Sequence, residues 1–281
     1  MSLSIQQSLR SATDRLSTAS DTARLDAEIL LAHVLDTDRS RLFTWPEQIL
    51  TPEQETSFLA LIERRSRGEP VAYLVGDQDF WTLKLKVTTD TLIPRPETEL
   101  LVEQALAHLA ADQSCTVADL GVGSGAIALA IANERPLAQL IGIDQSPGAL
   151  MVAEENAQQL GIRNVRFQQS DWLAGFPADC FDMIVANPPY IAAADPHLQQ
   201  GDVRFEPVSA LIAGADGLDD IRRIVQQAAV CLKPGGRLLM EHGYDQQQAV
   251  IDLLNKAGYH EVCGKRDLAG QPRMVMAQKP R

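Results

Sequence analysis

The segment 181–191 reads FDMIVANPPYI, an apolar run of strand character that stops at Asn187 and continues into two prolines and a tyrosine. A residue that precedes proline is held in an extended conformation, so the backbone of Asn187 is rigid. Its side-chain oxygen could accept one N–H of a planar NH2 group, and the Pro188 carbonyl could accept the other. Pro189 keeps these acceptors rigid, and Tyr190 could stack on the group. In isolation, the motif could equally be a turn without a ligand.

The chemistry that such a site suits is substitution at an amide or exocyclic amine nitrogen. The lone pair of this nitrogen is delocalised, so the nitrogen is a poor nucleophile. Two fixed acceptors would polarise it and align it with an electrophile, which is catalysis by orientation and electrostatics. The motif therefore predicts a transferase site and names Asn187 and Pro188 as its catalytic residues.

A second set of residues predicts a nucleoside-binding site. The segment 119–128 reads DLGVGSGAIA, in which Gly121, Gly123 and Gly125 permit left-handed backbone angles and close approach of a ligand. This loop, which includes Val122 and Ser124, fits the pattern G-x-G-x-x-A. Asp144 follows about 20 residues later, where a carboxylate accepts hydrogen bonds from ribose hydroxyls. NAD and S-adenosylmethionine both carry such a ribose, so this pair of signals leaves both open.

Two further features favour S-adenosylmethionine. Asp119 stands just before the glycines, where a carboxylate suits a cationic ammonium group better than a diphosphate. The third strand end reads SDW, in which Asp171 could accept from an adenine amino group and Trp172 could supply a flat apolar wall. The five histidines show no metal-ligand spacing, so we expect no metal.

The elements that must position these residues alternate between strand and helix from residue 116 onward, and this pattern predicts a parallel sheet covered on both faces. Ligands of such sheets lie at the carboxyl ends of the strands, where all the residues above are placed. We expect a helical domain over 1–70, a β-hairpin linker over 71–95 and the α/β domain over 96–281. A helix is predicted over 221–236 and a strand over 237–242. The helical domain carries no cofactor motif, so we expect it to recognise the substrate.

Composition restricts the partners. The formal net charge is −12 and no Lys/Arg-rich run is present, which argues against a surface that tracks polyphosphate. No apolar run reaches the roughly 20 residues of a membrane span. The four cysteines form no CxxC pair, which is typical of a reducing compartment. We expect a cytoplasmic protein without membrane or stable nucleic-acid binding.

The sequence resembles the bacterial protein-(glutamine-N5) methyltransferases, in particular those that act on peptide chain release factors. The resemblance rests on IPRPETE, DLGVGSGAIALAIA, NPPYI and PHLQQGDVRFEPVSALIAGADGLDDI, and it covers nearly the whole chain. One departure is Val122, where the family commonly has Thr. The resemblance implies a Rossmann-like class I methyltransferase sheet of seven strands with the last one reversed.

The resemblance also implies ligands and partners. The glycine loop, Asp144, Asp171, Trp172 and Asn187 would contact or border S-adenosylmethionine, which leaves as S-adenosylhomocysteine. Residues 187–190, with the aromatic Phe80 nearby, would hold the glutamine of the Gly-Gly-Gln loop of class 1 release factors. Separately from the resemblance, we expect the enzyme to act as a monomer. Other readings are a ribosomal protein glutamine, an exocyclic amine in DNA or ribosomal RNA, an NAD-dependent oxidoreductase, and a non-enzymatic regulator or RNA-binding module.

Overall fold

The computed structural model describes residues 3–281 and divides the chain into two compact units. The first unit consists of the chain up to Asp77 together with Gln199–Phe205, and the second consists of Gln78–Leu198 and Glu206–Arg281. These limits differ from the predicted divisions after residues 70 and 95. None of the helices within residues 3–281 combines the length and the apolar character that a membrane span needs.

The first unit is helical. Its helices are α1 (Ile5–Leu16), α2 (Ala23–Val34), α3 (Arg39–Thr44), α4 (Pro52–Ser66) and α5 (Val71–Val75). The predicted start of α4 is confirmed, because the Thr51 side chain accepts from the Gln54 backbone and the Gln54 side chain accepts from the Thr51 N–H. The apolar faces of α1, α2 and α4 enclose one core that includes Leu30, Phe58 and Ile62.

Contacts of the buried Arg65 side chain link the segment 199–205 to the helical unit. Arg65 on α4 donates from Nε to Asp26 Oδ2 on α2 over 2.7 Å, and from Nη1 to Asp202 Oδ1 over 3.1 Å. Arg204 adds a hydrogen bond to the Arg67 carbonyl. A buried guanidinium needs several acceptors to offset its desolvation, and Asp202 supplies one of them.

The second unit begins with a two-stranded hairpin and contains a mixed sheet. Its elements are β1 (Asp77–Phe80, which starts one residue before the boundary), β2 (Leu83–Lys86), η1 (Pro96–Thr98), α6 (Glu99–His108), β3 (Thr116–Leu120), α7 (Ala126–Glu134), β4 (Gln139–Asp144), α8 (Pro147–Leu160), β5 (Val165–Gln169), β6 (Phe181–Ala186), α9 (Asp219–Cys231), β7 (Leu232–Glu241), α10 (Gln247–Lys256), β8 (His260–Arg266) and β9 (Pro272–Gln278). Short 3-10 turns η2 (Pro196–Gln199), η3 (Gly201–Phe205) and η4 (Val208–Ala210) interrupt the connection from β6 to α9, and η3 lies in the helical unit.

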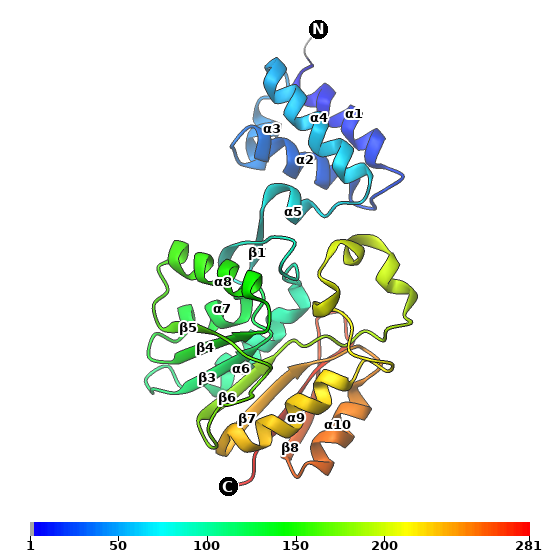
Figure 1. The fold of residues 1–281 in the computed structure, drawn as a ribbon. Coiled ribbons are helices and arrows are strands. Elements are labelled where there is room, and N and C mark those ends of the chain that lie inside the picture. The colour runs from blue at the N-terminus through cyan, green and yellow to red at the C-terminus, as the bar shows by residue number, and fades with distance from the viewer. Residues whose placement is uncertain (1–2) are drawn as a thin grey trace. The chain divides into compact units, whose positions relative to one another are not determined.

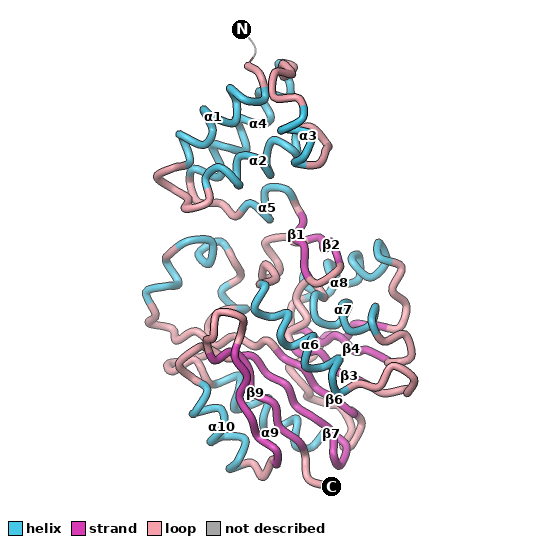
Figure 2. The backbone as a smooth tube through the Cα atoms, turned by 180° about the vertical axis from the view of Figure 1, so that it is seen from behind, coloured by secondary structure: helices cyan, strands magenta, loops and turns pink. Residues whose placement is uncertain are grey.

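The large sheet has the strand order β5-β4-β3-β6-β7-β9-β8, and β9 runs antiparallel to its neighbours β7 and β8. The predicted seven-stranded sheet with a reversed last strand is therefore confirmed. Helices α6, α7 and α8 cover one face, and α9 and α10 cover the other (Figure 1). Figure 2 shows the same sheet from the α6 side.

One predicted boundary is wrong. The helix expected over 221–236 ends at Cys231, and Leu232 already belongs to β7, which begins five residues before the predicted strand. Pro234 explains the early end, because proline cannot donate within a helix and holds the preceding residue in an extended conformation. The apolar face of α9 nevertheless packs on the sheet through Ile221, Ile224 and Ala228, as predicted.

Candidate active site

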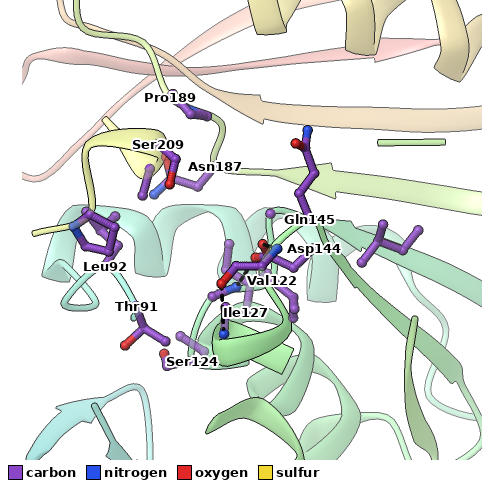
Figure 3. A pocket seen from close by; sticks show the side chains of 18 of the residues that line it. Thr91, Leu92, Val122, Ser124, Ile127, Asp144, Gln145, Asn187, Pro189 and Ser209 are labelled. Carbon is purple, nitrogen blue, oxygen red and sulfur yellow. Dashed lines mark hydrogen bonds between the residues drawn. The ribbon is translucent and has the colours of Figure 1, made fainter. Parts of the chain in front are cut away.

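A cavity of about 390 Å³ opens at the carboxyl ends of β3, β4 and β6. This volume lies within the range of pockets that hold small ligands. In Figure 3, Asp144 and Gln145 come from the end of β4, Asn187 from the end of β6, and Ser209 from the connection that follows. The residues predicted from the sequence that line the cavity are Gly121, Val122, Gly123, Ser124, Asp144, Trp172, Asn187 and Pro189.

The glycine loop forms the floor between β3 and α7. Gly121 and Gly123 have φ angles of 72° and 54°, which side-chain-bearing residues rarely adopt. A Cβ on Gly121 would lie 3.5 Å from the Trp172 ring, so the indole packs directly over this backbone. Gly125 does not line the cavity. It precedes α7 at φ 88°, where a Cβ would meet the Leu129 side chain at 2.8 Å, so this position has no room for a side chain.

Asp144 is the carboxylate of the cavity wall, and the backbone holds it in place. Its Oδ2 accepts from the N–H of Gly123 over 3.0 Å, and its Oδ1 accepts from the N–H of Ser146 over 2.9 Å. Ser146 in turn caps α8 by accepting from the N–H of Ala149. Each carboxylate oxygen can accept a second hydrogen bond. The carboxylate is thus oriented beside the glycine loop and keeps capacity for hydroxyl donors.

Asp119 lies beneath the loop and does not line the cavity, contrary to the expectation that it faces a ligand. Its Oδ2 accepts from the N–H of Ala128 over 2.9 Å, and its Oδ1 has no hydrogen-bond partner within residues 3–281. Burial raises the pKa of this carboxyl to about 7, the bond from Ala128 opposes the rise, and the nearby Asp144 adds to it. The structure therefore gives Asp119 the role of holding the first turn of α7 against β3.

Asp171 is also outside the cavity. Its side chain is half exposed, accepts from Gln145 Nε2 over 2.8 Å and pairs with Arg223. Its neighbour Trp172 turns the other way, with φ at 52°, and is buried against the loop while its indole N–H donates to Asp220. Such a backbone is unusual for a bulky residue and indicates strain at this position. Gln145 and Arg223 line the cavity where Asp171 was expected.

Only part of the Asn187–Tyr190 motif after β6 lies at the cavity. Asn187 and Pro189 line the cavity, whereas Pro188 and Tyr190 do not. The Tyr190 hydroxyl donates to Glu241 Oε1 over 3.2 Å and its ring packs against the sheet core, so its expected stacking on a substrate amide stays a prediction. Phe80, expected near the site, is a core residue, only 1% exposed and grouped with the apolar residues of α6 and α7.

Sequence reasoning missed the two loops that complete the cavity. Residues 90–98 and 207–212 supply Thr91, Leu92, Arg95, Thr98, Pro207, Ser209 and Ile212. Arg95 Nη2 contacts both oxygens of the buried Glu206, at 2.7 and 2.8 Å, and Glu206 also accepts from the N–H of Ile93. This ion pair ties the two loops together. The signals were present in IPRPETE and FEP, but local patterns do not reveal that the two segments meet.

The arrangement can bind a nucleoside-containing molecule and a second group side by side. The glycine backbone, the fixed carboxylate of Asp144 and the indole of Trp172 offer hydrogen-bond donors, acceptors and a flat apolar wall. Asn187 adds a planar amide at the same cavity. Within residues 3–281, no group of three His, Cys, Asp or Glu side chains is placed to hold a metal ion.

Comparisons with known proteins agree with this geometry. Residues 7–76 match the family described as "PrmC N-terminal domain", and residues 111–276 match the family described as "Methyltransferase domain". The chain is 51% identical over 272 residues to a "Release factor glutamine methyltransferase" of Xylella fastidiosa, with 97% of both chains covered. It is 54% identical over 259 residues to the protein of that name from Pseudomonas aeruginosa, covering 92% of this chain and 94% of that one.

The protein of the same name from Escherichia coli is 49% identical over 273 residues, covering 97% of this chain and 98% of that one. Among solved structures, a methyltransferase from Pyrococcus furiosus matches with a TM-score of 0.55 at 14% identity, covering 79% of this chain and 98% of that chain. This last likeness concerns the fold alone.

Proposed function

Because the chain belongs to the release factor glutamine methyltransferases, we propose that it transfers a methyl group from S-adenosylmethionine to the side-chain amide nitrogen of a release factor glutamine. The more specific proposal is N5 of the glutamine in the Gly-Gly-Gln loop of class 1 factors. The observation that carries it is the amide of Asn187 on the wall of a cavity whose other walls suit an adenosine.

The residues of the cavity fit the cofactor. When bound, S-adenosylmethionine supplies an electrophilic methyl group on sulfur and leaves as S-adenosylhomocysteine. We assign the ribose hydroxyls to Asp144, whose oxygens are already aligned by Gly123 and Ser146. We assign the adenine to the indole of Trp172 and to Gln145, because both line the cavity near the end of β4 and β5. Asp119 acts behind the loop, through its buried carboxyl and its contact with α7.

The substrate amide is oriented by Asn187. Its side-chain oxygen accepts one N–H of the glutamine, and the Pro188 carbonyl is the proposed acceptor for the other. These two acceptors turn the nitrogen toward the methyl group and stabilise the positive charge that it gains on alkylation. With S-adenosylmethionine bound, the nitrogen would form a bond to the methyl carbon as the carbon–sulfur bond breaks, and the excess proton would leave to solvent. A rigid Pro188-Pro189 backbone keeps this geometry before the substrate arrives.

The helical unit is the proposed docking site for the release factor. Phe43, Trp45 and Ile49 are each more than half exposed there, with the Arg41 guanidinium stacked 5.0 Å from the Trp45 ring. Exposed aromatics with an arginine are frequent in the centre of protein interfaces. We also propose that the enzyme acts as a monomer and that hydrogen-bond acceptors suffice for the chemistry without a metal.

The test offers S-adenosylmethionine carrying a labelled methyl group together with release factor, ribosomal proteins, duplex DNA and ribosomal RNA. We expect label in the release factor, and one added methyl on the glutamine after Gly-Gly by mass spectrometry. A release factor with that glutamine replaced by alanine is the control and should take no label. Label in a ribosomal protein or in nucleic acid would instead support the corresponding alternative substrate.

A further inference from the structure

A buried chain of hydrogen bonds connects Asn187 to Glu241 through Thr98, which borders the cavity. Asn187 Nδ2 donates to Thr98 Oγ1 over 3.2 Å, and Thr98 Oγ1 donates to Glu241 Oε2 over 2.8 Å. The other oxygen of Glu241 accepts from the Tyr190 hydroxyl over 3.2 Å. Thr98 and Glu241 are only 4% and 2% exposed. The members come from η1, from the end of β6 and from the last residue of β7.

The order of donors along this chain fixes the orientation of the Asn187 amide. An ionised carboxylate can only accept hydrogen bonds, and a hydroxyl carries one hydrogen. Since the Thr98 hydrogen goes to Glu241, Thr98 can interact with Asn187 only as an acceptor. The NH2 arm of Asn187 must therefore face Thr98, and its oxygen lies on the other arm of the amide, available to the cavity. The charge of Glu241 thus selects which atom of Asn187 meets the substrate.

We propose that Thr98 and Glu241 are positioning residues that hold the Asn187 amide oxygen toward the substrate nitrogen. This inference rests on the proposed function and adds two residues that do not themselves touch the reacting atoms. Thr98 borders the cavity, but its hydroxyl is engaged on both sides by Asn187 and Glu241. Glu241 makes no ion pair with any residue of the described chain 3–281, so its interactions are those hydrogen bonds and weaker, longer-range charges.

Two charged residues on two elements, Arg273 on β9 and Glu97 on η1, act on Glu241 at longer range. Burial raises the pKa of Glu241 to about 7, and the hydrogen bonds from Thr98 and Tyr190 and the charge of Arg273 on β9 oppose the rise. Glu97 on η1 adds to it. Below about pH 7 the carboxyl gains a proton and can donate to Thr98. The Thr98 hydrogen then points to Asn187 and favours the amide rotated by half a turn, with its oxygen toward Thr98. The NH2 arm would then face the cavity, where it cannot accept an N–H from the substrate.

The same chain of bonds could be purely structural, joining the start of α6 to β7. The two roles differ in what they predict. A structural role lowers stability and affects every activity of the folded enzyme only through the folded fraction. A positioning role lowers kcat in fully folded enzyme, leaves the affinity for S-adenosylmethionine unchanged, and gives kcat an acid limb that depends on Glu241.

The experiment measures methyl transfer to release factor for the wild type, Thr98→Val, Thr98→Ser and Glu241→Gln. Valine keeps the shape of threonine but removes the hydroxyl, and we expect kcat to fall about tenfold or more, with calorimetric cofactor affinity unchanged. Thr98→Ser restores the hydroxyl and should recover most of kcat. The matched control Thr116→Val makes the same change at the opposite end of the sheet and should keep wild-type kcat.

The pH profile provides the second readout. For the wild type, kcat should fall below about pH 7 with the pH dependence of a single ionisation. Glu241→Gln should lose this acid limb because glutamine does not titrate. A Thr98→Val enzyme with wild-type kcat, or an acid limb that persists in Glu241→Gln, would overturn the inference. A wild type that binds S-adenosylmethionine but methylates no release factor would instead refute the proposed function.

A third measurement is independent of activity. The side-chain NH2 resonances of Asn187, assigned with Asn187→Ser, should shift with pH around a midpoint near 7 in the wild type. The shift should be absent in both Thr98→Val and Glu241→Gln. Resonances that do not respond to pH in the wild type would overturn the coupling of Asn187 to Glu241, whatever the substrate of the enzyme proves to be.

Discussion

The N–H of Gly123 donates to Oδ2 of Asp144 over 3.0 Å, so the glycine loop itself aligns the carboxylate at the end of β4. This contact links the two sequence features that predicted a nucleoside site, the glycines and the acidic residue about 20 positions later. It also means that Asp144 is oriented before any ligand binds, which reduces the entropy that binding must overcome.

Asp144→Ala should therefore weaken S-adenosylmethionine binding. Loss of two hydrogen bonds to a charged acceptor should cost roughly 2–4 kcal/mol of binding free energy. Titration calorimetry would measure this loss. The matched control is Asp182→Ala, which also removes a carboxylate bonded to a backbone N–H, here that of Thr116, but away from the cavity. An Asp144 variant with the same dissociation constant as the Asp182 variant would remove Asp144 from the ribose site.

Asn187→Ala should reduce turnover far more than it reduces folding stability. Its acceptor is needed most as the substrate nitrogen gains positive charge, so we expect a loss of about 100-fold or more in single-turnover methyl transfer. The control Asn164→Ala removes a side chain that donates to the carbonyls of Ala132 and Ala138. That variant should lose thermal stability and keep normal chemistry when folded. If the two variants had the same rate of methyl transfer and the same thermal stability, the motif after β6 would be only a structural turn.

Asp119→Asn should stabilise the ligand-free protein at high pH. The folded pKa of about 7 lies above the ordinary value of 3.8, so the folded state holds more protons than the unfolded state between these values. Stability is thus fully present at low pH and is lost as pH rises from about 4 to 7, by an amount of the order of 4 kcal/mol.

Asparagine is neutral throughout, so the difference in the free energy of unfolding between Asp119→Asn and the wild type should grow by several kcal/mol between pH 4 and pH 8. Denaturant unfolding at a series of pH values measures it, and the other titrating groups cancel in the comparison. A difference that stays constant over this range would mean that Asp119 is ionised in the fold at all of these pH values.

The double variant Phe43→Ser, Trp45→Ser should raise the KM for release factor about tenfold or more while the affinity for S-adenosylmethionine stays unchanged. Both side chains are more than half exposed, so the fold should tolerate the change. The control Leu268→Ser alters a fully exposed apolar residue in the other unit and should change neither constant. Equal KM values for the two proteins would remove this surface from substrate recognition.

The sequence predicted the features that depend on local chemistry. The capping of α4 by Thr51 and Gln54, the start of α8 at Ser146, and the sheet class follow from short-range patterns, and the structure confirms each of them. Asn187 and Asp144 were located correctly at the cavity because strand ends are found from where an apolar run stops.

The direction of a side chain depends on what packs against it, and here the structure places several side chains away from the cavity. Tyr190 was expected to face a substrate, but a buried carboxylate 51 positions away accepts its hydroxyl. Phe80 was expected at the site, but the core beside α6 and α7 takes its ring. Asp171 and Trp172 are neighbours, and the positive φ of Trp172 sends them to opposite environments. No local pattern encodes these choices.

The segment Gln199–Phe205 has a consequence for exchanging parts between related enzymes. The chain passes between the two units at residues 77–78, 198–199 and 205–206, so the helical unit is not a simple N-terminal cassette. In a chimera that imports only the first 77 residues of a relative, the counterpart of Arg65 would come from the relative. Its partner Asp202, 137 positions later, would still come from this protein. Modular replacement therefore requires two spliced pieces, and the second must be inserted into a connection whose flanking residues form the cavity wall.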